Sequence, residues 1–184
     1  LKPQKRRTVV PFLQQAKVFY KPYGVVGVIS PWNYPFLLAF IDLIPALIAG
    51  NTALLKPSEI TPFTSDYGVK LMHEAGIPRD VVQIIHGDGR AGATLTEHVD
   101  YIAFTGSTAT GRKVAETAAK RLIPCSLELG GKDPCIVLED ADLDMTAAGL
   151  IRSGFENAGQ VCISIERVYA DARIYDALLE KLVY

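Results

Sequence analysis

Three cysteines are the strongest nucleophiles in the sequence, and their settings differ. Cys162 follows Gly159-Gln160-Val161, a polar stretch that is typical of an accessible loop. An accessible thiolate can attack a carbonyl carbon and form a covalent intermediate. Cys125 and Cys135 lie in apolar runs, where cysteine acts as a small buried hydrophobe, and that packing role is the alternative for Cys162. The setting therefore favours Cys162 as the candidate nucleophile.

Glu128 is the candidate general base. It comes at the end of an apolar run, where partial burial would raise its pKa into the range that suits proton transfer. The alternative is an ion pair with the nearby Lys132. The three histidines have no metal-ligand spacing and precede no motif suited to nucleophile activation, so we expect no metal site.

Two further segments have residue types that suit a dinucleotide. Thr105-Gly106-Ser107-Thr108 stands between a predicted strand and a predicted helix, where backbone N–H groups and the positive helix end can face a phosphate. Such glycine turns are about as often purely structural. Lys56-Pro57-Ser58-Glu59 follows another strand, where a lysine can meet phosphate or ribose and a carboxylate can accept bonds from ribose hydroxyls. The alternative is a solvated lysine and glutamate in a turn.

The elements that would position these residues alternate along the chain. Short runs rich in β-branched residues predict buried strands at 24–30, 52–55, 81–85, 100–104, 123–127 and 135–138. Helices are predicted at 35–49, 61–75, 90–97, 108–120 and 142–157. Thr61 with Pro62 opens the second of these helices, and Gly76 with Pro78 closes it. The alternation predicts an α/β fold with an open parallel sheet and flanking helices.

The segment Leu129-Gly130-Gly131 is the expected boundary between two domains. Residues 1–128 would form a dinucleotide-binding domain. Residues 129–184 would form the beginning of a second α/β domain, which carries Cys162 just after the helix at 142–157. On that helix, the apolar face would include Ala147, Leu150, Ile151 and Phe155.

Composition excludes several classes of partner. The chain has 184 residues, 19 of them basic and 20 acidic, so its net charge of -1 provides no field to attract nucleic acid or an anionic membrane. The most apolar stretch, 35–50, is too short to span a bilayer. An odd number of cysteines without paired spacing argues against a disulfide framework and for a reducing compartment, so we expect a cytoplasmic protein.

Five segments together resemble the NAD(P)-dependent aldehyde dehydrogenase superfamily, and they occur in that family's order. They are Pro31-Trp32-Asn33-Tyr34-Pro35, Lys56-Pro57-Ser58-Glu59, Phe104-Thr105-Gly106-Ser107, Glu128-Leu129-Gly130-Gly131-Lys132 and Gly159-Gln160-Val161-Cys162. The resemblance implies a Rossmann-like sheet followed by a catalytic domain. It also implies an oxidoreductase that converts an aldehyde to a carboxylic acid.

The resemblance implies a role for each catalytic residue. Cys162 would attack the aldehyde to give a thiohemiacetal, and hydride transfer to the nicotinamide would then give a thioester. The side-chain amide of Asn33 and the backbone N–H of Cys162 would stabilise the developing oxyanion. Glu128 would activate Cys162 or the water that hydrolyses the thioester.

The resemblance also implies which residues meet the cofactor and the substrate. Ile29, Trp32, Lys56, Glu59, Gly89, Gly106, Ser107 and Leu129 match positions that line the family's dinucleotide site. Glu59 favours a free 2′-hydroxyl and hence NAD, with NADP as the alternative. The chain is nearest the succinic-semialdehyde branch, but the two arginines which that branch uses for the substrate carboxylate align with Ile41 and Glu156. We therefore expect a neutral aliphatic or aromatic aldehyde.

Members of the family are much longer, so the chain is expected to be a fragment. The first domain would lack its N-terminal part, and the catalytic domain would be truncated. The β-hairpin through which members form homodimers or homotetramers is expected to be absent. Two alternatives to a working dehydrogenase remain: a dinucleotide-binding fragment without turnover, and cofactor-independent ester hydrolysis through Cys162.

Overall fold

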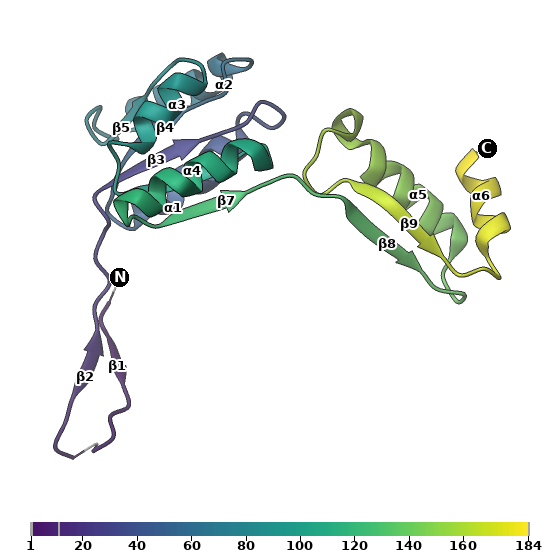
Figure 1. The fold of residues 1–184 in the computed structure, drawn as a ribbon, viewed down its shortest axis with the longest axis horizontal. Helices are drawn as coiled ribbons and strands as arrows, with labels where there is room; N and C mark the ends of the chain where they lie inside the picture. Colours follow the sequence, from purple (N-terminus) through teal and green to yellow (C-terminus); the bar gives the residue numbers. More distant parts are fainter. Residues whose placement is uncertain (1, 11, 184) are drawn as a thin grey trace. The chain divides into compact units, whose positions relative to one another are not determined.

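The computed structural model describes residues 2–10 and 12–183. Residues 1 and 184, which bound the two predicted domains, lie outside that part, as does residue 11. The chain divides into two compact units, Leu1–Glu128 and Leu129–Tyr184 (Figure 1).

The first unit contains a five-stranded sheet in which every neighbouring pair of strands is parallel. Its strands are β3 (Val25–Ile29), β4 (Thr52–Lys56), β5 (Val82–Ile84), β6 (Tyr101–Thr105) and β7 (Cys125–Glu128). Their order in the sheet is β5-β4-β3-β6-β7. The chain thus adds β4 and β5 on one side of β3 and then adds β6 and β7 on the other side. The predicted strands and the Rossmann-like α/β class are confirmed.

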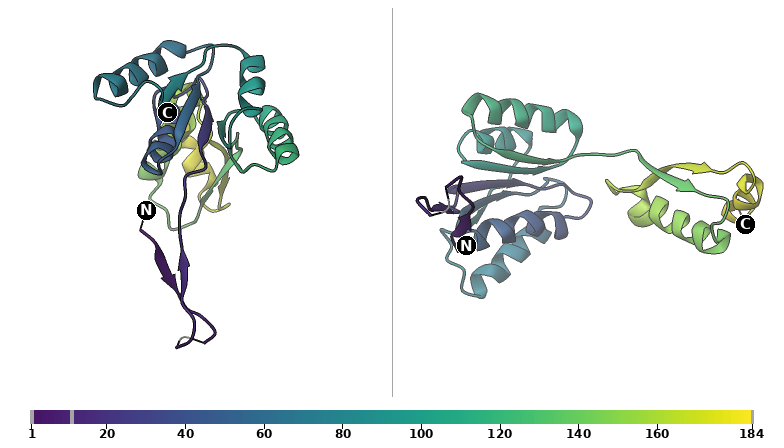
Figure 2. Two further views of the ribbon diagram at one scale, coloured as in Figure 1. Left: turned by 90° about the vertical axis from the view of Figure 1, so that its left-hand side faces the viewer. Right: turned by 90° about the horizontal axis from the view of Figure 1, so that it is seen from below.

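Helices cover both faces of this sheet. They are α1 (Leu37–Ile48), α2 (Pro62–Glu74), α3 (Gly89–Thr96) and α4 (Thr108–Arg121), close to the predicted ranges. Figure 2 shows α1 and α2 on one face and α3 and α4 on the other. Thr61 and Pro62 begin α2 and Gly76 follows its end with a φ of 101°, as the sequence predicted, although the Thr61 side chain makes no capping hydrogen bond. Among the described residues, no helix has both the length and the apolar character needed to cross a membrane.

The main core lies between the sheet and helices α1 and α2. Val28, Leu55 and Val82, one from each of three adjacent strands, are fully buried. Phe40 and Leu43 of α1 belong to the same cluster. Burial of each such side chain stabilises the fold by about 1.5–3 kcal/mol. Helices on both faces explain why the strands read as continuous apolar runs without alternation.

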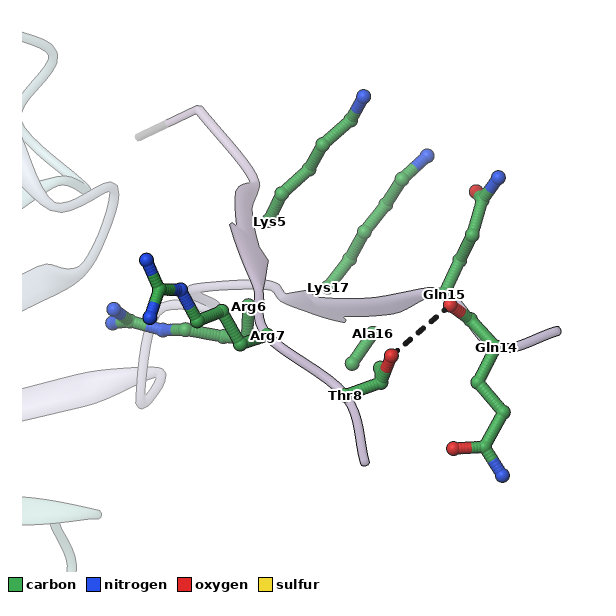
Figure 3. Close-up of a pocket in the computed structure, with 8 residues that line it drawn as sticks. All are labelled: Lys5, Arg6, Arg7, Thr8, Gln14, Gln15, Ala16 and Lys17. Atoms are coloured by element: carbon green, nitrogen blue, oxygen red, sulfur yellow. Dashed lines mark hydrogen bonds between the residues drawn. The ribbon is translucent and has the colours of Figure 1, made fainter. Parts of the chain in front are cut away.

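A β-hairpin precedes the sheet, so the expectation that the chain lacks one is wrong. Strands β1 (Gln4–Arg6) and β2 (Ala16–Val18) pair antiparallel, with Lys5 opposite Lys17. Figure 3 shows these two lysines side by side, at a cavity of about 490 Å³ that is also lined by Arg6, Arg7 and neighbouring polar residues. The strands are short, charged and largely exposed, so they give none of the apolar signal by which the other strands were predicted.

The second unit is a βαβ arrangement. Strands β8 (Asp133–Val137) and β9 (Ile165–Ala170) are parallel and are connected through α5 (Leu143–Phe155) and the short 3₁₀ helix η1 (Glu156–Gly159); α6 (Tyr175–Val183) follows. Ala147 and Leu150 of α5 are buried with Val137 and Leu178, as their spacing predicted. Ile151 and Phe155, expected on the same buried face, are 45% and 75% exposed, because within this unit nothing described covers the last turn on that side.

Candidate functional site

A cavity of about 370 Å³ opens at the carboxyl ends of β3, β4 and β6, where the strand order reverses direction. In open α/β sheets, ligands bind at this kind of switch point. Seven residues expected at a dinucleotide lie together along its wall: Ile29, Trp32, Lys56, Glu59, Gly89, Gly106 and Ser107. They come from three strand ends and from the first turns of α3 and α4.

Lys56 and Glu59 form the charged pair of the cavity. Their Nζ and Oε2 atoms are 3.1 Å apart, and the lysine side chain is 6% exposed whereas that of the glutamate is 55% exposed. A hydrogen bond from its own backbone N–H and a second from Lys56 hold the pKa of Glu59 below its usual value. Glu59 is therefore an anion at neutral pH. An ionised carboxylate accepts bonds from ribose hydroxyls and repels a phosphate.

The beginnings of α3 and α4 face the same cavity. The side chain of Ser107 accepts a bond from the Thr110 N–H at 3.3 Å and caps α4. Asp88 caps α3 by accepting a bond from the Arg90 N–H at 2.9 Å. The Gly106 N–H donates to the Glu128 carbonyl at 3.0 Å, so this amide continues the sheet ladder. The two helix ends bring partial positive charge to the cavity.

Several lining residues were missed at the sequence level. Thr110, Lys113, Val114 and Thr117 come from α4, and Gly92, Ala93 and Thr96 from α3. Their spacing of three or four residues from the glycine turns is the signal that could have found them, because it places them on one helical face. Lys113 adds a second cation to the wall, in addition to Lys56.

The cavity suits a ligand with both hydroxyl and phosphate groups. The hydroxyl of Ser30, at the end of β3, is buried and has no hydrogen-bond partner among residues 2–10 and 12–183. A buried hydroxyl without a partner costs about 1–3 kcal/mol, so a partner from a ligand or water is favoured there. Together with the two lysines and the helix ends as donors and the anionic Glu59 as acceptor, this hydroxyl forms a set of polar groups that fits NAD or NADP.

The candidate base and the candidate oxyanion donor also belong to the first unit. Glu128 is the last residue of β7 and pairs in register with Thr105 of β6. Its side chain is exposed in this unit, so the expected partial burial is wrong there. Lys132, the alternative partner, makes an ion pair with Glu166. Asn33 is half-buried in the bend between β3 and α1.

Leu129 and Cys162 belong to the second unit. Leu129 is its first residue and is half-buried. Cys162 lies in a turn between η1 and β9 with an exposed side chain, whereas Cys125 and Cys135 are half-buried within strands. The three thiols therefore differ in accessibility in the way that their sequence settings predicted. Cys162 is the most accessible of the three thiols.

Known proteins resemble this chain along its whole length. A relative from Mycobacterium bovis, named "Putative succinate-semialdehyde dehydrogenase 2" with NADP(+) as its cofactor, is 47% identical over 98% of this chain and 35% of its own length. The NAD-dependent aldehyde dehydrogenase of Sinorhizobium meliloti superposes with a TM-score of 0.94 at 41% identity, over 100% of this chain and 37% of that structure.

A third relative has been solved with its cofactor. The structure of PnpE in complex with nicotinamide adenine dinucleotide has a TM-score of 0.86 and 46% identity, over 89% of this chain and 34% of that one. The chain thus spans about a third of the length of these relatives. The model of the aldehyde dehydrogenase family matches residues 4–184. The chain belongs to the aldehyde dehydrogenase family.

Proposed function

We propose that this chain takes part in the oxidation of an aldehyde to a carboxylic acid, with NAD(P) as hydride acceptor and a covalent intermediate on Cys162. The observation that carries the proposal is the cavity at the ends of β3, β4 and β6, whose wall combines Lys56, Glu59 and two helix ends. The first unit would bind the dinucleotide. The second would supply the nucleophile.

The donor set favours NAD over NADP. Lys56 would donate to ribose hydroxyls, and the ionised Glu59 would accept from them. A 2′-phosphate would have to approach the same carboxylate, and like charges repel. Titration with both cofactors tests this preference. Tighter binding of NADP would refute it.

Three residues would carry the covalent chemistry. The sulfur of Cys162 bonds to the carbonyl carbon, and negative charge develops on the carbonyl oxygen. The Asn33 amide and the Cys162 backbone N–H are donors suited to that oxygen. When bound, the nicotinamide supplies the acceptor for the hydride that leaves the same carbon. Glu128 would take a proton from Cys162 or from the water that hydrolyses the thioester and releases the acid.

We further propose a neutral aldehyde as substrate. Ile41 is 54% exposed on α1, and Glu156 is exposed at the start of η1. By the resemblance to the succinic-semialdehyde branch, these residues match the two positions where arginines would bind a distal carboxylate. An apolar side chain and an anion both disfavour a substrate anion. Comparison of kcat/KM for propanal, benzaldehyde and succinic semialdehyde is the test, and a strong preference for the last would refute the proposal.

The β1–β2 hairpin would serve self-association into a homodimer or homotetramer. A two-stranded sheet is marginal alone, and its open edges can pair with another strand. Lys17→Pro removes a strand N–H, whereas Lys17→Ala keeps it. We expect sedimentation analysis to show weaker association for the proline variant only. Equal association of both variants would contradict this role.

The main test uses the 184-residue chain and its Cys162→Ser variant. NAD binding is measured by calorimetry, and aldehyde oxidation by NADH absorbance. Binding with turnover that depends on Cys162 is the expected result. Binding without turnover would refute catalysis by this chain and leave a nucleotide-binding protein. Cleavage of p-nitrophenyl acetate without NAD would measure the ester reaction of Cys162 separately.

A further inference from the structure

The loop that carries Cys162 is closed by one buried hydroxyl. Ser164 follows Cys162 by two residues and is 3% exposed. Its Oγ lies 3.2 Å from the Ser153 carbonyl and 3.1 Å from the Gly154 carbonyl, in the last turn of α5. The last carbonyls of a helix have no partner within it. Ser164 therefore ties the end of the loop to the end of the helix from which the loop departs.

The same loop contains an unfavourable backbone conformation. Asn157 has φ 50° and ψ 38°, and Ala158 has φ 59° and ψ 31°, so both residues are in the left-handed region. For alanine this conformation is costly, because its Cβ crowds the following carbonyl. Such conformations persist only where the surrounding structure enforces them. The contacts that hold the two ends of this loop together must therefore supply that constraint.

The backbone of Cys162 also lies close to the glycine segment that begins the second unit. A Cβ on Gly131 would lie 2.7 Å from the Cys162 carbonyl oxygen, so a side chain at position 131 would clash with the turn. The Ser164 N–H donates to the Val161 carbonyl at 3.0 Å and closes the turn around Cys162. The thiol remains exposed while its backbone lies within a hydrogen-bonded turn.

We propose that Ser164 is a positioning residue for Cys162, whose buried hydroxyl holds the 156–164 loop on the end of α5 against relaxation of the left-handed turn at Asn157 and Ala158. The proposal rests on the proposed function in one respect, namely that Cys162 is the nucleophile. Ser164 touches no reacting atom. It acts by keeping the thiol in one orientation.

Two kinds of variant separate the constraint from general stability. Ser164→Ala removes the hydroxyl. At the exposed position 158, Ala158→Gly relieves the left-handed strain and Ala158→Val increases it, without a change in the core. We expect Ser164→Ala and Ala158→Val to loosen the loop, and we expect Ala158→Gly to restore much of the loss when combined with Ser164→Ala.

Amide hydrogen exchange measures the loop directly. The amide at position 164, bonded to Val161, should exchange about tenfold faster in Ser164→Ala, which loses roughly one hydrogen bond, and it should also exchange faster in Ala158→Val because the strain in the loop increases. The Thr146 N–H, bonded to Asp142 in the first turn of α5, should be unchanged. In parallel, the rate of p-nitrophenyl acetate cleavage by Cys162 should fall, and the double variant Ala158→Gly/Ser164→Ala should recover.

Wild-type exchange at position 164 in both Ser164→Ala and Ala158→Val would overturn the proposal. Faster exchange at Thr146 as well would also overturn it, because the effect would then be a general loss of stability. If the wild-type chain cleaves no ester through Cys162, the proposed function fails, and the exchange measurements still decide whether Ser164 holds the loop.

Discussion

Replacement of Lys56 by methionine should weaken dinucleotide binding and leave the fold intact. The Lys56 side chain is almost fully buried, and its stem packs at the end of β4 while Nζ reaches Glu59. Methionine keeps an unbranched side chain of similar volume and removes only the ammonium group. The ion pair with the half-exposed Glu59 contributes about 0–1 kcal/mol, so the change in unfolding free energy should be small.

The effect on binding follows from the bonds that the ammonium would make. A hydrogen bond with a charged donor contributes about 1.5–3 kcal/mol. Since about 1.4 kcal/mol is tenfold in an equilibrium constant, Lys56→Met should raise the Kd for NADH by about 10- to 100-fold. The increase in Kd should fall in this range whether the lost bond is to a phosphate or to a ribose hydroxyl.

The assay uses the single tryptophan of the chain. Trp32 lines the same cavity as Lys56, so quenching of its fluorescence by NADH reports occupancy directly. Lys70→Met is the matched control, because Lys70 is an exposed residue of α2 that pairs with Glu74 at 3.7 Å, and it lies outside the cavity lining. A Kd for Lys56→Met within twofold of the wild-type value, at an unchanged Tm, would refute this assignment of the cavity.

Two further predictions concern stability. Gly68→Ala should lower the free energy of unfolding by about 1 kcal/mol, because the new Cβ would lie 2.2 Å from Phe40 in the core and the cost of overpacking exceeds the gain in helix propensity. Gly149→Ala should raise the free energy of unfolding, because its Cβ would meet nothing within 4 Å. Denaturant titrations measure both changes, and the reverse order of stability would contradict the packing. Asp42→Asn should stabilise the chain at neutral pH, since burial and then the charge of Glu128 raise the pKa of Asp42. A carboxyl group whose pKa is raised in the folded state binds more protons in the folded protein than in the unfolded one, so the folded protein loses stability as pH rises above about 4. The higher Tm of Asp42→Asn should therefore disappear below that pH.

The sheet of the first unit could be predicted because its strands carry a strong local signal. Val25–Ile29 and Tyr101–Thr105 are apolar runs bounded by turn residues, and helices on both faces make such runs obligatory. Strand β9 was missed because Ile165–Ala170 contains charged, exposed residues. Its partner is β8, in which Asp133 pairs with Ile165, and α5 lies between the two strands in the sequence. A pairing over that distance leaves no pattern in the local sequence.

The residue types that are available for chemistry follow from the amino-acid sequence alone. It distinguished Cys162 in a polar loop from Cys125 and Cys135 in strands, and the exposure of the three thiols follows that distinction. It also placed Lys56 and Ser107 at or just after the ends of strands. In each of these cases the signal lies within a few neighbouring residues, and local composition is what decides whether a segment is a loop or a buried strand.

Only the tertiary structure brought those strand ends together. Ile29, Lys56 and Thr105 lie in separate segments, and they share one cavity because parallel register places the ends of β3, β4 and β6 at the same edge of the sheet. Likewise, Ser164 meets the end of α5 only because the chain returns there after the loop. Contacts of this kind form only when distant segments pack together, so the free energy of packing cannot be assigned to any one segment of the sequence.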